Sequence, residues 1–421
     1  MPLEELPHCG SVVPGEDEER VARLFAFLRR TFERRKRLFA ERGVFSLGEY
    51  RRLGAEPLPR IVVLLDGYAG FAAAFERVNL GELVDALPRL VGEGRPLGVH
   101  FVVTADRRGA VPNALGGVVP AKIVLRMADE DEFAALGIAP KLVRGAWLPP
   151  GRGFLPASGL ELQVAILGGD APGEAQARAL AGLAAELCER HPGASAPPVR
   201  SLPSTIDRSQ LPPARALAVS IGLGDTELEP LAVDLAERHF LVVGPYRSGR
   251  SSALAALCAG LAEAGGCELH LLAPRRTLLS ELGLFASVAA GIEACDARAA
   301  ELASGLDARP PGAPALVVVV DDGEELAETP GAVALETLVR RGRDRDVRVI
   351  AAAERQGAQR AFGGWLRELR KEEHGLLLSP DPDVDGELLA VRLPRRTTPV
   401  YPPGRGYLVA AGTVELVQVA T

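Results

Sequence analysis

The sequence predicts an α/β fold of two modules, each built on a mostly parallel, doubly wound sheet. Runs of β-branched residues alternate with stretches of helical spacing, as expected for strands buried on both faces of a parallel sheet. Three such segments recur in the same order about 250 residues further along the chain. In the second half, a glycine-rich stretch follows one strand and precedes an apolar helix, and the first half has no equivalent of it.

The composition of this 421-residue chain excludes several classes of protein. Apolar residues make up 47%, enough for buried cores, and the net charge of −7 argues against a surface that coats nucleic acid. The start resembles no secretory leader and no apolar run reaches membrane-spanning length, so we expect a cytoplasmic protein. With no CxxC pair and an odd total, the cysteines indicate buried free thiols rather than zinc or disulfides. They are Cys9, Cys188, Cys258, Cys267 and Cys295.

A proline- and serine-rich stretch, residues 191–215, lacks apolar periodicity and is typical of a linker. We therefore predict domains at 1–190 and 216–421. The recurring segments relate the two domains to each other. PRIVVLLDGYAGF (59–71) matches PALVVVVDDGEEL (314–326), GVHFVVTADRRGA (98–110) matches DVRVIAAAERQGA (346–358), and GRGFLPASGLELQVA (151–165) matches GRGYLVAAGTVELVQVA (404–420).

Each recurring segment has a predicted structure. The apolar runs within 59–71 and 314–326 are strands, and we expect crossover helices at 82–94 and 336–345. The two closing segments, each a glycine turn with short alternating runs, predict antiparallel additions at the edge of the sheet. Upstream, residues 18–43 repeat apolar side chains at three- and four-residue spacing and predict an amphipathic helix with a solvated basic face.

The glycine-rich stretch after FLVV has the GxxxxG spacing of a phosphate-binding P-loop. Glycines let the backbone amides approach phosphate oxygens, and the helix N-terminus favours an anion. We expect Ser251 to hold Mg²⁺, and Arg250, which replaces the usual Lys, to meet the β and γ phosphates of ATP. The alternative is a glycine-rich turn without a ligand. The predicted nucleotide-binding residues are Gly244, Pro245, Tyr246, Arg247, Ser248, Gly249, Arg250, Ser251 and Ser252.

A second nucleotide-site element is a carboxylate at the end of a neighbouring buried strand. The run ALVVVV ends in Asp321, predicted to order Mg²⁺, and Asp322, predicted to polarise the attacking water. Asp322 is shorter than the usual Glu, which predicts weak activity. The first half keeps Asp66 and has Gly67 in place of the base. Helix capping or turn formation is the alternative role of these carboxylates.

These residues resemble the FtsK/SpoIIIE family of hexameric translocase ATPases, and most nearly the tandem ATPase modules of EccC-type proteins of type VII secretion. The resemblance rests on FLVVGPYRSGRSS, VVVVDD and PPGRGYL in the second half, and on IVVLLDGYAGF and GVHFVVTADRR in the first. It implies RecA-like P-loop modules, a first module without its P-loop, and a ring formed with further copies or an upstream motor subunit. It also suggests that Arg107, Arg126 and Arg355 reach phosphate or a neighbouring subunit, although surface roles are equally compatible with them.

The resemblance implies membrane helices only in an upstream partner, and a chain that is a fragment, a split product or a degenerate protein. Three functions follow from it. The first is an ATP-binding translocase module with weak or regulatory turnover. The second is an ATP-driven DNA pump, for which RRGRDRDVR and LRELRK are basic candidates that also fit solvated helix faces. The third is a nucleotide-stabilised module that binds the signal of a secreted protein through an apolar groove.

Overall fold

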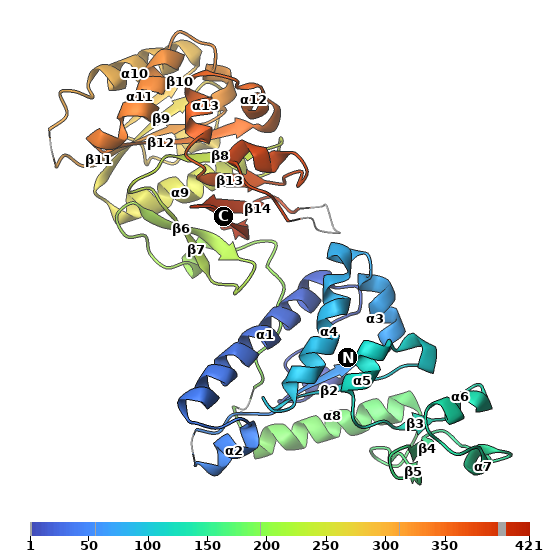
Figure 1. Cartoon of the computed structure of the whole chain (residues 1–421). Coiled ribbons are helices and arrows are strands. Elements are labelled where there is room, and N and C mark those ends of the chain that lie inside the picture. Colours follow the sequence, from blue (N-terminus) through green and yellow to red (C-terminus); the bar gives the residue numbers. More distant parts are fainter. Residues whose placement is uncertain (1, 55, 194, 311, 395–400) are drawn as a thin grey trace. The chain divides into compact units, whose positions relative to one another are not determined.

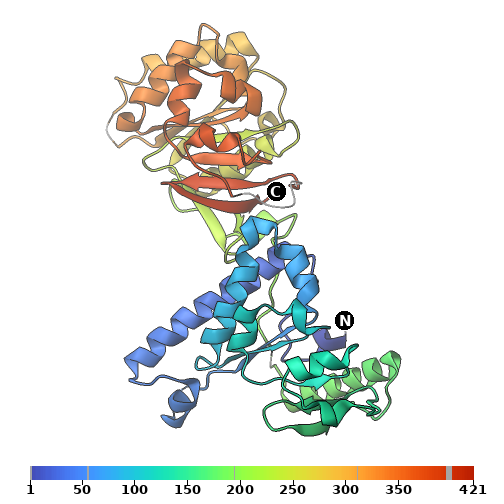
Figure 2. The same ribbon diagram turned by 45° about the vertical axis from the view of Figure 1, so that its right-hand side comes forward.

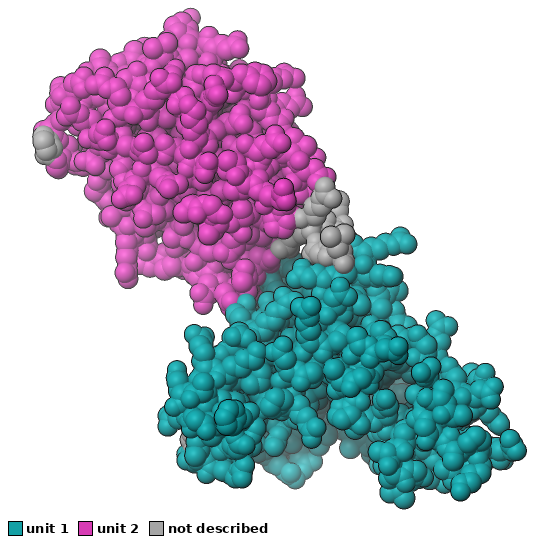
Figure 3. Space-filling model, in the orientation of Figure 1, with its two compact units in different colours: residues 1–201 teal, residues 202–421 magenta. Residues whose placement is uncertain are grey.

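The computed structural model describes residues 2–54, 56–193, 195–310, 312–394 and 401–421. The chain divides into two compact units, Met1–Ser201 (unit 1) and Leu202–Thr421 (unit 2), which are coloured separately in Figure 3. The predicted linker 191–215 therefore divides between the units. Its second part belongs to unit 2, where Leu202 and Ile206 are buried.

Unit 1 contains two small sheets with helices beside them (Figure 1). Its helices are η1 (Pro2–Glu5), α1 (Glu18–Glu41), α2 (Leu47–Arg52), α3 (Tyr68–Phe75), η2 (Val78–Gly81), α4 (Glu82–Gly94), η3 (Arg108–Ala110), α5 (Asn113–Val118), α6 (Glu130–Ala135), α7 (Pro140–Val143) and α8 (Gly173–Arg190). Its strands are β1 (Ile61–Leu65), β2 (Val99–Val103), β3 (Val124–Leu125), β4 (Arg152–Leu155) and β5 (Leu160–Gln163).

The predicted amphipathic helix of unit 1 is α1, which begins after the capping carboxylate of Asp17. Its apolar face packs with α3 and α4 into one core. The basic face of α1, which was predicted to be solvated, includes one buried arginine. Arg35 is buried, and its guanidinium donates to the backbone carbonyls of Leu97 and Pro59. These two bonds attach α1 to the segments that precede β2 and β1.

Unit 2 is built on one ten-stranded sheet. Its strands are β6 (Ala218–Gly224), β7 (Pro230–Asp234), β8 (Phe240–Gly244), β9 (Cys267–Ala273), β10 (Ser287–Ala290), β11 (Ala315–Val320), β12 (Val347–Glu354), β13 (Gly375–Leu378), β14 (Arg405–Ala410) and β15 (Thr413–Val419). Its helices are η4 (Arg208–Gln210), α9 (Arg250–Ala264), η5 (Leu278–Glu281), α10 (Ile292–Ser304), η6 (Gly323–Leu326), α11 (Ala332–Arg341), η7 (Arg343–Arg345), α12 (Arg355–Arg360), α13 (Gly364–Arg370) and η8 (Asp385–Leu389).

The sheet order of unit 2 is β10-β9-β11-β12-β8-β13-β14-β15-β6-β7, and the strands from β10 to β13 are parallel. Both faces of the parallel part are covered, as the continuous apolar strands predict. One face packs against α9, and the other against α10, α11 and α13 (Figures 1 and 2). The order places the carboxyl ends of β8, β9 and β11 at the same edge of the sheet, where a ligand site is expected.

The closing segments of both halves form antiparallel hairpins, but neither is the edge addition expected from the sequence. In unit 1, β4 and β5 join β3 in a separate sheet. In unit 2, β14 and β15 lie inside the sheet, because β6 pairs with β15 and β7 follows β6. The local alternation predicted the hairpins, whereas the partners of their outer edges depend on segments far away in the sequence.

The cysteines of the chain form no disulfide bonds. All five cysteines are free; Cys258 and Cys295 are buried, and Cys188 is exposed. Burial raises the pKa of the Cys258 thiol to about 12, so that thiol stays protonated near neutral pH.

Among the described helices, none combines the length and apolar character that crossing a membrane requires.

Candidate functional site

The predicted P-loop lies between the buried strand β8 and helix α9. Two of its glycines are required by close approaches. A Cβ at Gly244 would lie 2.4 Å from Ser248 Oγ and 2.9 Å from Leu378 Cβ. Gly249 has φ +99°, and a Cβ there would lie 2.8 Å from the backbone nitrogen of Gly404. Larger residues would therefore force the loop open at both ends.

Backbone hydrogen bonds fix the shape of this loop. Arg247 takes a left-handed conformation (φ 62°), and the Ser248 amide donates to Pro245 O at 3.2 Å. The Gly404 amide donates to Ser248 O at 2.8 Å, so the segment before β14 supports the loop. Helix α9 begins directly after Gly249 with first-turn amides that have no acceptors within the helix. Such a helix start is suited to an anion.

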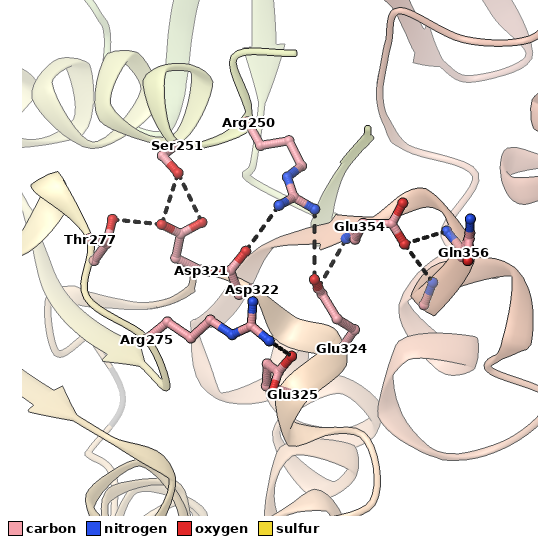
Figure 4. Close-up of polar contacts among 11 residues, drawn as sticks. Arg250, Ser251, Arg275, Thr277, Asp321, Asp322, Glu324, Glu325, Glu354 and Gln356 are labelled. Carbon is pink, nitrogen blue, oxygen red and sulfur yellow. Dashed lines mark hydrogen bonds and ion pairs between the residues drawn. The ribbon is translucent and has the colours of Figure 1, made fainter. Parts of the chain in front are cut away.

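Asp321, at the end of β11, faces the start of α9 (Figure 4). Ser251 Oγ donates to Asp321 Oδ2 at 3.0 Å, and Thr277 Oγ1 donates to the same oxygen at 2.6 Å. Asp321 is only 2% exposed. The structure therefore brings together the two residues expected to hold Mg²⁺ and adds a second hydroxyl. Carboxylate and hydroxyl oxygens are the hard ligands that Mg²⁺ prefers.

Arg250 points toward two carboxylates that follow β11 (Figure 4). Its Nη2 lies 3.0 Å from Asp322 Oδ1, and its Nη1 lies 3.7 Å from Glu324 Oε1. The other oxygen of Glu324 accepts the backbone amide of Glu354 at 3.0 Å. Asp322 itself is in the left-handed backbone region. The guanidinium expected to meet phosphates and the carboxylate expected to polarise water thus contact each other.

Burial changes the acidity of both carboxylates. It raises the pKa of Asp322, the charge of Asp321 raises it further, and Arg250 opposes the increase. Burial also raises the pKa of Glu324, against the hydrogen bond from the Glu354 amide. The site therefore holds three acidic side chains and one arginine in a space where charge is poorly solvated.

Residues 1–166 match the model of the FtsK/SpoIIIE family. The ESX secretion system protein EccC of Thermomonospora curvata is 28% identical over 99% of this chain and 34% of its own length. The ESX-4 secretion system protein EccC4 of Mycobacterium tuberculosis is 30% identical over the same shares. The chain is homologous to the ATPase modules of EccC proteins. It spans about one third of the length of these two relatives.

Solved EccC structures agree with this fold. The structure of Thermomonospora curvata EccC (ATPases 2 and 3) in complex with a signal sequence peptide has a TM-score of 0.71 and 26% identity, covering 100% of this chain and 80% of that one. EssC (ATPases 2 and 3) from Geobacillus thermodenitrificans has a TM-score of 0.79 at 21% identity, which shows a shared fold. The predicted α/β fold with tandem RecA-like ATPase modules is therefore confirmed.

In this EccC homologue, three residues near the candidate site were not anticipated from the sequence. Thr277 follows β9, the strand next to β11, and a hydroxyl just beyond a parallel strand is the only signal that would have pointed to it. Glu324 lies two residues after Asp322, so its proximity in sequence could have indicated it. Arg275 donates to Glu325 at 2.5 Å near the same sheet edge. None of the three belongs to a motif with fixed spacing.

The remaining loop residues of the EccC-like site differ in exposure. Ser248 is buried, and Pro245 is partly buried. Tyr246 is 78% exposed, and the guanidinium of Arg247 lies 5.3 Å from the centre of its ring. Ser252 is exposed on the first turn of α9.

The three arginines singled out in the sequence have different surroundings. Arg355 is held within unit 2, because its Nε lies 3.0 Å from Oδ2 of the buried Asp385 and its Nη2 donates to Ser379 O at 2.7 Å. Arg107 and Arg126 are exposed in unit 1. Arg355 thus connects the start of α12 to the segment after β13.

The two basic stretches considered for DNA contact are largely neutralised within unit 2. Arg340 and Lys371 pair with Glu368, Arg343 with Glu372, and Arg341 and Arg345 with Asp307. Arg348 is buried and donates to backbone carbonyls, including Leu235 O at 2.6 Å. Ion-paired and buried guanidinium groups are poorly placed to bind DNA phosphates.

Proposed function

We propose that this chain acts as a pair of ATPase modules in an EccC-like type VII secretion complex. In this proposal unit 1 corresponds to ATPase 2 and unit 2 to ATPase 3 of the Thermomonospora structure. Unit 2 binds ATP and Mg²⁺ and turns ATP over slowly, so that binding mainly regulates a stronger motor module. The chief support is the Ser251–Asp321 contact at 3.0 Å beside the glycine loop.

Each loop element has a role in the proposed binding. The amides of residues 245–251 and the start of α9 would receive the phosphates. Ser251, Asp321 and Thr277 offer the oxygen ligands for Mg²⁺, which when bound neutralises charge on the β and γ phosphates. Arg250 binds phosphate only by leaving Asp322 and Glu324, because one guanidinium cannot serve both sets of oxygens at once. That exchange lowers the net gain from phosphate binding.

Slow turnover follows from the same contacts. A general base must be free to accept a proton from the attacking water. Asp322 is a short carboxylate held by Arg250 at 3.0 Å. Arg250 also carries its charge on a larger planar group than Lys, so the geometry at the γ phosphate differs from that of a Lys loop.

The proposed partners are ATP, further copies or an upstream motor subunit in a ring, and a secreted protein substrate. Recognition of that substrate's signal is a second candidate function, favoured by the signal sequence peptide in the Thermomonospora complex, to which this whole chain is similar. We place the complex on the cytoplasmic side of a membrane, with attachment through the upstream partner.

Calorimetric titration with a non-hydrolysable ATP analogue and Mg²⁺ tests the nucleotide site. We expect saturable binding by the wild type and its loss in Gly249→Val and Arg250→Ala. Equal affinity in all three proteins would remove the site from unit 2.

Titration with duplex DNA at low and at high salt tests the alternative function of a DNA pump, because protein contacts to DNA phosphates weaken steeply as salt rises. DNA binding at low salt that disappears at high salt would favour that alternative.

A further inference from the structure

Residues 202–208, in the second part of the predicted linker, form a strap that packs against unit 2. Leu202 is 4% exposed and belongs to a core of unit 2, and Ile206 is 2% exposed. The amide of Thr421 donates to Ile206 O at 2.9 Å. Because two of its apolar side chains are buried, the strap has a defined position although its composition is typical of a linker.

Arg405, at the start of β14, holds the first part of the strap. Its side chain is largely buried, with the residue 9% exposed. Its Nη2 donates to Leu202 O at 2.8 Å and to Pro203 O at 2.5 Å, and its Nε donates to Gln418 Oε1 at 3.0 Å. Hydrogen bonds from a guanidinium are charge-assisted and stronger than those between neutral groups. The position of Arg405 and the position of the strap therefore depend on each other.

The residue before Arg405 supports the phosphate loop. Gly404 donates its amide to Ser248 O at 2.8 Å, and a Cβ on Gly249 would lie 2.8 Å from the same amide nitrogen. The carbonyl of Gly404 accepts the amide of Val419 at 2.9 Å. Gly404 and Arg405 share one planar peptide bond, so a displacement of Arg405 also displaces Gly404. The close contact at Gly249 leaves the loop little room for such a displacement.

The other end of the strap contacts α9, the helix that follows the phosphate loop. Arg208 donates from Nη1 to Ala256 O at 2.7 Å and from Nη2 to Glu263 Oε2 at 2.6 Å. A Cβ on Gly260 would lie 3.1 Å from Arg208 Nη2, so the guanidinium lies close against α9. The strap is thus connected to the phosphate loop through Arg405 and to the following helix through Arg208.

We infer, on the proposed function that unit 2 binds ATP, that Arg405 is a positioning residue through which the strap regulates the phosphate loop. With the strap in place, Arg405 is held by its carbonyls, and Gly404 presents its amide to Ser248 O. The loop then keeps the shape that receives phosphates. Release of the strap removes two acceptors of Arg405 and loosens this support, so affinity for ATP falls. By linkage, bound nucleotide holds the strap more tightly, and a partner that draws the linker away from unit 2 weakens nucleotide binding.

Calorimetric titration of the full chain with the ATP analogue and Mg²⁺ tests the effect on affinity. We expect Arg405→Gln to weaken binding about tenfold, because the charged donor that holds the strap is lost. Leu202→Ala should also weaken binding, since it loosens the strap while Arg405 stays in place. The double variant should bind no more weakly than Arg405→Gln, because both changes act through one contact. Arg20→Gln is the matched control: Arg20 donates to Val199 O of the linker within unit 1, and its loss should leave affinity unchanged.

Two measurements follow the loop and the strap directly. Amides of residues 246–250 should exchange faster in Arg405→Gln than in the wild type, without any nucleotide. The analogue should slow trypsin cleavage after the exposed Arg200 in the wild type and have no such effect in Arg405→Gln.

Equal affinity of the wild type and Arg405→Gln would overturn the inference, as would additive losses in the double variant. If Arg405→Gln does not fold, Leu202→Ala carries the same comparisons. A wild type that binds no analogue would overturn the proposed function instead. Hydrogen exchange then still decides on Arg405, since faster exchange at 246–250 supports the positioning role and unchanged exchange overturns it.

Discussion

Arg250 and Asp322 form an ion pair within the candidate nucleotide site, with Nη2 and Oδ1 3.0 Å apart and both side chains largely buried. Glu324 lies on the other side of the guanidinium at 3.7 Å. A phosphate group would need the same guanidinium N–H groups as these carboxylates. On the proposed function, two sets of oxygens, those of the carboxylates and those of the phosphates, compete for one arginine.

Asp322→Asn tests this competition. An amide keeps the size of the side chain and removes the charge that holds Arg250. We expect affinity for the ATP analogue to increase about fivefold, equivalent to about 1 kcal/mol, while turnover falls. Calorimetric titration and phosphate release measure the two quantities. Glu325→Gln is the matched control, because Glu325 pairs with Arg275 and not with Arg250. Unchanged or weaker affinity in Asp322→Asn would contradict the competition.

Gly249→Ala and Gly291→Ala together separate local backbone strain from loss of the loop, because both glycines have a positive φ. Gly249 (φ +99°) approaches Gly404, whereas Gly291 (φ +88°) has open space around its Cβ position. Gly249→Ala and Gly291→Ala should each cost about 1 kcal/mol through φ alone. Only Gly249→Ala should also lose nucleotide binding, because its Cβ displaces the support of the loop. Thermal unfolding and titration of both variants measure this difference, and equal affinities would show that the Gly404 contact is dispensable.

The pH dependence of stability tests the burial of Glu324. Burial raises its pKa in the folded protein, so its favourable contribution is present below the unfolded value of about 4.3 and is lost as pH rises through the folded pKa. At pH 7.5 the buried carboxylate is therefore destabilising. We expect Glu324→Gln to raise the melting temperature by about 2 °C at that pH and by less as pH falls toward 4. The variant could instead melt at a lower temperature than the wild type at pH 7.5, or the difference in melting temperature could stay constant with pH. Either result would show that burial of the Glu324 carboxylate does not destabilise the folded protein.

Local sequence patterns predicted much of the fold and the main site. The β-branched runs identified β1 and β11, and helical spacing identified α1 and α4, because burial on one or both faces leaves a periodic pattern. The position of β14 and β15 inside the sheet could not be predicted, since pairing with β6 depends on contacts across nearly the whole unit.

The contacts within the site were the least predictable part. The GxxxxG spacing placed Ser251 near Asp321, because the motif fixes the backbone between strand and helix. It gave no information on where the long side chain of Arg250 would point. The pairing of Arg250 with Asp322 and Glu324 depends on side-chain rotamers and on the left-handed backbone at Asp322. Gly67 has that same left-handed backbone in unit 1.

Trp365 provides an intrinsic probe of the segment that follows β11. It is buried beside Gly323, and its indole N–H donates to Leu326 O at 3.1 Å. Trp147, the second of the two tryptophans in the sequence, is 85% exposed. In a Trp147→Phe background, fluorescence therefore reports on Trp365 alone. If nucleotide binding draws Arg250 away from Asp322 and Glu324, residues 321–326 should shift and change the emission of Trp365.

Gly323→Ala in the same background calibrates that signal. A Cβ at Gly323 would lie 2.8 Å from Trp365 Cη2, so the ring or the loop must move. Overpacking of this kind should cost about 1–3 kcal/mol and shift the emission without any nucleotide. A Trp365 emission that responds to Gly323→Ala but not to saturating ATP analogue would show that the loop stays in place when nucleotide binds. In that case Arg250 would keep its carboxylate partners, and the phosphates would be held by the backbone amides alone.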